Sequence, residues 1–206
     1  MRTWLENRVK QALMRSPSPL LGFAFAALAL TLLTAAKLAA LRTVPGSEDL
    51  ALHVPAWLLL PAAALLGTMV VWGALVFGMT LVLGDSARTA ELTGLGFAPI
   101  ALIGAMELLL AAWWPAKVTA PPPPNDWLSR LLWAARLQTA AQQTPTFYAL
   151  SGLELLGVLA GAYLLFNVLR IWQPRRSGIA TVLFAAYMLG IWVLRNYPTL
   201  VHLLSP

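Results

Sequence analysis

Five long apolar runs constrain this chain more than any other feature of its sequence. They cover residues 20–41, 56–83, 97–114, 148–172 and 179–197, with polar or proline-containing stretches between them. The hydrocarbon core of a bilayer is about 30 Å thick and takes about 20 helical residues to cross. Backbone groups find no water there, so an unpaired segment crosses as a helix. The runs predict an all-α fold, a polytopic membrane helical bundle with five transmembrane helices plus amphipathic interfacial helices.

The composition excludes an ordinary soluble domain. Hydrophobic residues make up 59% of the 206 residues and charged residues only 11%, whereas soluble domains carry about 25% charged residues. The net charge is +6, but Lys and Arg stand at the ends of the apolar runs, where membrane proteins use them as anchors and topology signals. We therefore expect a lipid bilayer around the chain and no nucleic-acid partner.

Polar, basic and proline-rich stretches divide the chain into four segments. Residues 1–19 form a basic amphipathic N-terminal segment, which is expected to lie at the membrane surface. Residues 20–114 hold transmembrane helices 1–3, with a polar connection over 85–93 before the third. Residues 115–147 form a Pro-rich loop with an amphipathic helix, and residues 148–206 hold transmembrane helices 4 and 5 and a short tail. The first apolar run is too long for the core of a signal peptide, so we expect a span there.

The Pro-rich loop contains the longest polar stretch of the chain. Its four prolines at 121–124 predict a stiff polyproline II spacer. Asn125 or Asp126 is expected to cap a helix over 127–141, because apolar residues recur on one side of that stretch. Such a helix lies either on the membrane or on a protein partner, and the sequence leaves both alternatives open.

The basic residues favour a cytoplasmic N-terminus. The membrane-surface basic residues are Arg8, Lys10, Arg15, Arg175 and Arg176. They fall before the first span and between the fourth and fifth, which five crossings place on the same side. We expect a multi-pass protein of a bacterial inner (plasma) membrane with its C-terminus outside. Lys37, near the end of the first span, is expected to snorkel outward.

Three polar residues lie within or near the apolar runs. A carboxylate inside the bilayer costs several kcal/mol and is a functional candidate by default. Glu107 is a candidate for a proton or cation path, together with Glu154 or Arg170, and the alternative is a structural role in which Glu107 is protonated or bonds a neighbouring helix. Glu154 is expected near the interface, and Asn167 is expected to join two helices by a hydrogen bond.

Glycines in the second and fourth apolar runs predict close helix packing. Gly157 and Gly161 form a small-xxx-small motif, which lets two helix backbones approach closely. Gly73 and Gly78 are expected to pack in the same way in the second run.

No pattern in the sequence predicts catalysis. Nucleophile, zinc-protease and phosphate-loop motifs do not occur, and the two histidines fall in polar stretches outside the apolar runs. The chain has no cysteine, which excludes thiolate ligands and a Cys nucleophile. We therefore expect no enzyme activity, no cofactor and no metal site.

Two stretches give the chain a resemblance to a known family. Residues 94–110 (GLGFAPIALIGAMELLL) form a Gly/Pro-bearing helix after a polar connection, and residues 150–194 end a span in an aromatic and basic turn before a Gly/Ala-rich one. Together with the basic start, this pattern resembles bacterial members of the Yip1 domain family over roughly residues 16–197. The resemblance implies a five-span, non-enzymatic scaffold, although the long Pro-rich loop departs from compact members.

These observations favour a non-catalytic integral membrane scaffold or accessory subunit of a membrane protein complex. We expect protein partners in the membrane or a homo-oligomer. The alternative is a small transporter or channel with Glu107 on a proton or cation path. Five spans without an inverted repeat are few for a transporter unless it oligomerises.

Overall fold

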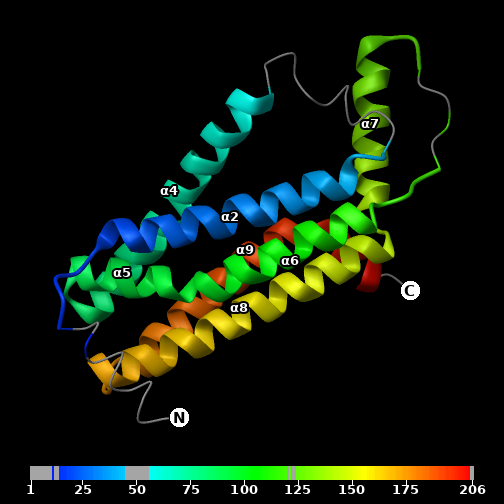
Figure 1. Ribbon diagram of the computed structural model, residues 1–206. Helices are drawn as coiled ribbons and strands as arrows, with labels where there is room; N and C mark the ends of the chain where they lie inside the picture. The colour runs from blue at the N-terminus through cyan, green and yellow to red at the C-terminus, as the bar shows by residue number, and fades with distance from the viewer. Residues whose placement is uncertain (1–10, 12–13, 45–55, 120, 122–123, 205–206) are drawn as a thin grey trace.

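The structure is a bundle of long helices with one helix set across its end (Figure 1). It is a computed structural model that describes residues 11, 14–44, 56–119, 121 and 124–204. The predicted surface segment with Arg8 and Lys10 therefore lies mostly outside the described residues. The described helices are α2 (Pro19–Leu41), α4 (Ala56–Leu83), α5 (Ser86–Gly96), α6 (Ala98–Trp113), α7 (Trp127–Ala141), α8 (Pro145–Trp172) and α9 (Ser177–Leu204).

The predicted fold class is confirmed. Five helical stretches are long and apolar enough to cross a membrane: α2, α4, α5 with α6, α8 and α9. No strand occurs among the described residues. Prolines begin two of these helices, because Pro19 and Pro145 stand in the first turn, where a backbone N–H has no partner to lose. The protein is thus a multi-pass membrane protein.

The third span is longer than the sequence predicts, because the polar connection over 85–93 is helical. Asp85 caps α5 by accepting a hydrogen bond from the backbone N–H of Arg88 at 3.0 Å. Phe97 (φ −83°, ψ −13°) ends α5 and begins α6, so the two helices make one 28-residue stretch with a break. Pro99 lies in the first turn of α6 and donates no bond there.

Four helices pack side by side in the bundle. α2 lies against α6, α6 against α8, and α8 against α9, while α4 lies at the edge against α5, α2 and α9 (Figure 1). Only 17% of the apolar stretch of α4 is buried, compared with 44% of that of α8. Most of α4 therefore faces the surroundings of the bundle, which are lipid for a membrane span.

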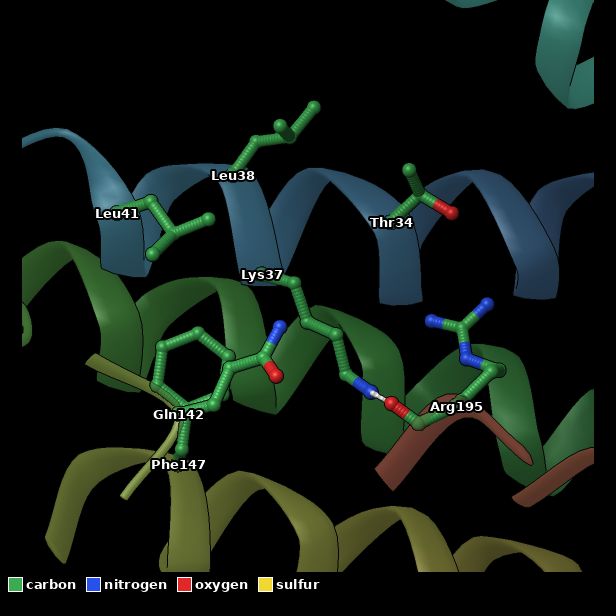
Figure 2. A pocket seen from close by; sticks show the side chains of 7 residues that line it. All are labelled: Thr34, Lys37, Leu38, Leu41, Gln142, Phe147 and Arg195. Atoms are coloured by element: carbon green, nitrogen blue, oxygen red, sulfur yellow. Dashed lines mark hydrogen bonds between the residues drawn. The ribbon is translucent and has the colours of Figure 1, made fainter. Parts of the chain in front are cut away.

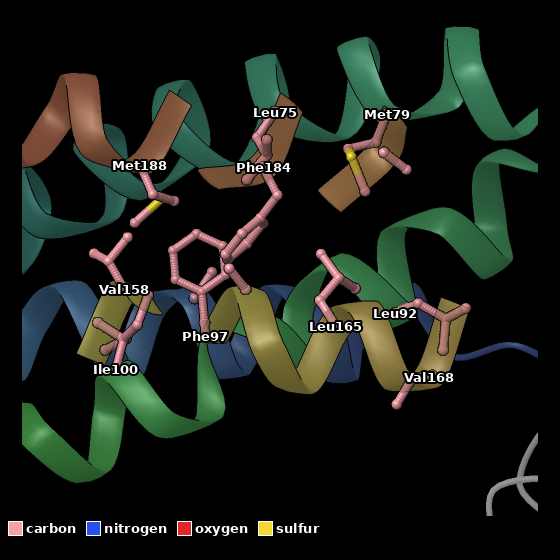
Figure 3. Packing of buried hydrophobic residues seen from close by; sticks show 14 of the residues in the cluster. Leu75, Met79, Leu92, Phe97, Ile100, Val158, Leu165, Val168, Phe184 and Met188 are labelled. Carbon is pink, nitrogen blue, oxygen red and sulfur yellow. The ribbon is translucent and has the colours of Figure 1, made fainter. Parts of the chain in front are cut away.

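An apolar core fills the middle of the bundle. Phe97 and Phe184 are fully buried and meet edge to face, with ring centroids 5.9 Å apart (Figure 3). Leu75 and Met79 of α4 and Leu165 of α8 surround them. Edge-to-face aromatic pairs contribute about 0.5–1.5 kcal/mol beyond their buried area. The core therefore forms where the break at Phe97 inserts a ring between α8 and α9.

Glycines set the distance between the helices of the core. A Cβ atom on Gly161 would collide with the carbonyl oxygen of Gly96, and one on Gly157 would lie 3.4 Å from the Cα of Ile100. Gly94 of α5 similarly meets the backbone of Gly22 of α2. These contacts hold α5 and α6 close to α2 and α8. The sequence motif at 157 and 161 thus lies at a helix contact, but Gly22, Gly94 and Gly96 were not among the predicted packing residues.

The glycines of α4 differ from the expectation. A Cβ atom on Gly73 would meet no described atom within 4 Å, and one on Gly78 would make only an ordinary contact of 3.5 Å with Leu183. Gly73 therefore packs against no described helix of this chain. The reason is that α4 lies at the edge of the bundle, which its composition does not reveal.

The amphipathic helix of the Pro-rich loop has the predicted bounds, as α7 (Trp127–Ala141). Asp126 caps it, because its carboxylate accepts a hydrogen bond from the backbone N–H of Ser129 at 2.8 Å. This hydrogen bond holds the pKa of Asp126 below its usual value. Leu137 and Ala141 are buried in a second apolar cluster with residues at the ends of the spans, Ala40, Leu41, Val44, Ala111, Ala116, Phe147 and Leu150. One side of α7 therefore docks on the bundle itself.

We expect Gly161→Leu to disrupt the bundle, because the new side chain collides with the backbone of α5. Overpacking of this kind costs about 1–3 kcal/mol or more. Gly152→Leu is the matched control on α8, since a Cβ atom at 152 meets nothing within 4 Å. Thermal unfolding in detergent should show a lowered midpoint for Gly161→Leu only. Equal midpoints for the two variants would contradict the close contact of α8 with α5.

Candidate functional site

Lys37 points into the bundle. Its Nζ lies 3.3 Å from Oε2 of Glu154 on α8 and donates to Oδ1 of Asn196 on α9 at 3.0 Å. A longer bond of 3.5 Å runs to the backbone oxygen of Arg195 (Figure 2). The prediction that Lys37 snorkels outward is therefore wrong. It shares the inward face of α2 with the buried Leu33 and Ala40, where an anionic partner lies within its reach.

Glu154 is the anion at the centre of this cluster. Its side chain is only 3% exposed, and each carboxylate oxygen has a cationic neighbour. Nζ of Lys37 lies beside Oε2, and Nε of Arg195 lies 3.0 Å from Oε1. The N–H of Arg195 Nε is not aimed at that oxygen, so this contact is an ion pair without a hydrogen bond. Glu154 is buried between three helices, and its depth near the interface stays a prediction.

Asn196 connects the charged groups to the backbone. Its Nδ2 donates to Oε2 of Glu154 at 3.1 Å and to the carbonyl of Trp192 at 2.9 Å. Its Oδ1 accepts from Ser151 Oγ at 2.6 Å as well as from Lys37. The indole of Trp192 donates in turn to the carbonyl of Ser151 at 2.9 Å. Asn196 is only 1% exposed, and both N–H donors and both acceptor positions of its side-chain amide are used.

Sequence reasoning missed Asn196, and it assigned the bridging role to Asn167 instead. Nδ2 of Asn167 donates to the carbonyl of Tyr163, four residues earlier on the same helix, at 2.8 Å. The positions of the neighbouring charged residues along their helices could have pointed to the region of Asn196. Lys37 lies one turn before the end of α2, Glu154 in the third turn of α8, and Arg195 two to three turns before the end of α9. These positions fall at similar depths, where opposite charges in a bilayer find each other.

Glu107 is the fourth ionisable residue of the cluster. It is fully buried on α6, and neither carboxylate oxygen has a hydrogen-bond partner in the described part of the chain. It lies within electrostatic range of Glu154, Lys37 and Arg195. The structure therefore brings Glu107 and Glu154 together, as the proton-path hypothesis requires, although Arg195 and not Arg170 is the arginine beside them.

A pocket of about 230 Å³ opens beside the cluster (Figure 2). It lies between α2, α9 and the residues that join α7 to α8. Its lining residues are Thr34, Lys37, Leu38, Leu41, Gln142, Phe147 and Arg195. Side chains of Lys37 and Arg195 are 18% and 23% exposed, so both cations reach the pocket while Glu154 stays behind them.

An apolar layer separates the cluster from the opposite end of the bundle. Within one to two turns of the charged residues stand Leu33 on α2, Ile100 on α6, Val158 on α8 and Met188 on α9, all of them buried. The aromatic pair of the core lies in the same apolar cluster. The charged groups therefore have access to the end that carries α7, and packed side chains close the way to the other end.

A second group of polar contacts holds the opposite end together. Arg88 of α5 pairs with Glu91 at 2.8 Å and donates to the backbone oxygen of Arg15. Gln173 and Arg176 of the turn between α8 and α9 donate to the last carbonyls of α4, Leu83 and Val82, at 2.9 and 2.8 Å. Arg15, Arg175 and Arg176 thus lie at the same end of the bundle, as the sequence predicts.

The cluster joins two cationic side chains to one buried carboxylate. No group of three or more metal-binding side chains occurs among the described residues. Comparison of the chain with protein-family models, with curated proteins and with solved structures gives no match. Function must therefore be inferred from the geometry of the bundle and its charged residues.

We expect Glu154→Gln and Glu107→Gln to differ in their effects on stability. Removing the Glu154 carboxylate leaves two partly buried cations without their anion. A fully buried pair would lose about 3–5 kcal/mol, and the solvent access of Lys37 and Arg195 should make the loss smaller. Glu107 makes no hydrogen bond in the described structure, so a neutral amide there should change the free energy of unfolding by less than about 1 kcal/mol. Chemical unfolding of both variants in the same detergent measures the difference. A loss for Glu107→Gln as large as that for Glu154→Gln would show that the two carboxylates are equally required.

Proposed function

We propose that this protein is a non-catalytic membrane scaffold or accessory subunit of a membrane protein complex. The observation that carries the proposal is the internal pairing of the cluster. Glu154 pairs with both Lys37 and Arg195 across α2, α8 and α9, and Asn196 ties the carboxylate to the backbone. Buried charges used in this way fix which helices meet and in which register. The apolar layer beyond them supports the same role, because it leaves no polar route through the described bundle.

The surface of α4 supports docking of a partner within the membrane. Its outward face carries Leu66, Val70, Phe77 and Leu81, which are 65%, 69%, 68% and 73% exposed. Gly73 lies on the same edge helix with open space around it. Small residues on a lipid-exposed helix allow a second helix to approach closely. A partner helix of another chain, or of a second copy, is therefore proposed to pack on α4.

The same proposal includes the orientation and the membrane. Arg15, Arg88, Arg175 and Arg176 belong to the end of the bundle away from α7. The positive-inside rule then supports a cytoplasmic N-terminus and an outer C-terminus, and a bacterial inner membrane is proposed with them. The resemblance to the Yip1 domain family agrees with a five-span scaffold and is proposed on the same footing.

The test of the scaffold is the isolation of the protein at native expression level in a mild detergent. We expect a second protein to co-purify in a fixed ratio, identified by mass spectrometry. Gly73→Leu should weaken that association, because the added side chain fills the space a partner helix needs, while Gly152→Leu on α8 should leave it unchanged. Isolation of the chain by itself, in the wild type and both variants, would contradict the proposal.

Glu107 favours a second candidate function, a proton or cation path. A fully buried carboxylate without a hydrogen-bond partner among the described residues is the arrangement found along such paths. A path also needs access from both ends, and the layer of Leu33, Ile100 and Val158 closes one of them in this structure. Transport would therefore require this layer to open.

Proteoliposomes distinguish the two functions. We expect wild-type protein to give no more proton or cation flux than protein-free vesicles under an imposed gradient, since the apolar layer is packed. Glu107→Gln should then retain both the fold and the co-purifying partner. A flux in the wild type that Glu107→Gln abolishes, with unchanged stability, would establish the path in place of the scaffold.

A further inference from the structure

The pocket beside the charged cluster has two unlike walls. One wall carries the cationic groups of Lys37 and Arg195, with the amide of Gln142 and the hydroxyl of Thr34 nearby. The rest of the lining is apolar and consists of Leu38, Leu41 and Phe147, of which Leu38 points away from the other two in Figure 2. Leu38 is 43% exposed, so the apolar wall continues onto the lipid-facing side of α2. A ligand that fits both walls carries a negative group and a hydrocarbon part.

The wall formed by Lys37 and Arg195 presents positive charge to the pocket. Glu154 is only 3% exposed and is already shared between Lys37 and Arg195. The terminal nitrogens of Arg195 point toward α2 in Figure 2, and no described residue accepts a hydrogen bond from them. Guanidinium groups with free donors bind phosphate oxygens well, because their donors match its geometry. The open side of the cluster therefore carries a net positive charge and offers the donors of the Arg195 guanidinium.

The size and the depth of the pocket fit a lipid headgroup. A cavity of about 230 Å³ has room for several water molecules, so it can hold a phosphate with its glycerol but not acyl chains. Lys37 precedes the end of α2 by four residues, or about 6 Å along the helix axis. The 23 residues of α2 are about 34 Å long, close to the thickness of the hydrocarbon core, so Lys37 lies near one edge of the core of a bilayer that α2 spans. Acyl chains attached there would run along Leu38 outside the pocket.

We propose that this pocket binds the phosphate of an anionic phospholipid from the leaflet on the side of α7. The terminal nitrogens of Arg195 donate to the phosphate oxygens, Lys37 adds its positive charge beside them, Gln142 donates to the glycerol, and the chains lie on the apolar side of α2. Occupancy stabilises the contact of α2 with α9, which in the described structure depends on Lys37 reaching across to Asn196 and the backbone of Arg195. The site is independent of the scaffold proposal, because it needs no protein partner.

Native mass spectrometry of the purified full chain tests the site. The detergent-solubilised protein is titrated with phosphatidylglycerol, with phosphatidylcholine and with inorganic phosphate. We expect one phosphatidylglycerol to bind at least about tenfold more tightly than phosphatidylcholine, because the net negative charge meets two cations. Inorganic phosphate should compete only weakly, since it lacks the hydrocarbon part. Equal binding of the two lipids would overturn the anionic specificity, and equal binding of phosphate would overturn the lipid as its source.

Two matched substitutions locate the binding on this pocket. Leu38→Glu places a negative charge at the exposed mouth and should weaken phosphatidylglycerol binding by about tenfold. Leu38→Gln introduces a side chain of the same size as Leu38→Glu but without the charge. It should bind phosphatidylglycerol within about twofold of wild type, and both variants should bind phosphatidylcholine within about twofold of each other. Arg195→Gln should abolish the preference for the anionic lipid, with folding checked by thermal unfolding. An unchanged lipid preference in Leu38→Glu would contradict the site even if Arg195→Gln fails to fold.

Discussion

The fold depends on one carboxylate placed between two cations inside the bundle. Glu154 would cost several kcal/mol alone in this environment, and so would Lys37 or Arg195. Glu154 pairs with both cations, and this attraction offsets the cost of burial only when α2, α8 and α9 stand in the register that brings the groups within about 3 Å. Apolar side chains in a bilayer cannot specify that register, because lipid tails satisfy them equally well. The charged cluster therefore selects one arrangement of these three helices.

The rest of the bundle is held by close packing. In the half away from α7, Gly22, Gly94, Gly96 and Gly161 let α5 approach α2 and α8 at backbone distance. Without a hydrophobic force between helices in lipid, such contacts supply the attraction. The break at Phe97 contributes to this packing. It places the ring of Phe97 against Phe184, while the glycines of α5 stay in contact with the neighbouring helices. Charge pairing at one end and backbone contact at the other therefore complement each other.

Both kinds of contact, charge pairing and close backbone packing, hold the helices together, which agrees with the proposed scaffold function. The ionisable residues are used mainly to hold the helices, and packed apolar side chains block a polar route to the other end. What remains open is the side of Lys37 and Arg195 that faces the pocket. A scaffold that holds a lipid there would couple its own rigidity to the membrane around it. Glu107, buried beside the cluster, is the residue whose substitution separates this role from transport.

The sequence by itself determined the features that depend on local pattern. The five apolar runs and the helix over 127–141 follow from length, hydropathy and spacing, and the structure has them. The sequence offered Asn125 or Asp126 as the cap, and the structure has Asp126. The helical course of 86–96 did not follow, because its polar residues and glycines resemble a loop until α2 and α8 are there to bury them. The direction of Lys37, the position of Asn196 at the centre of the cluster and the bare surface around Gly73 were decided only by the tertiary structure. Each of these depends on how a helix is rotated and which helix stands next to it, and in a span that is apolar all round the sequence carries no periodic signal for that rotation.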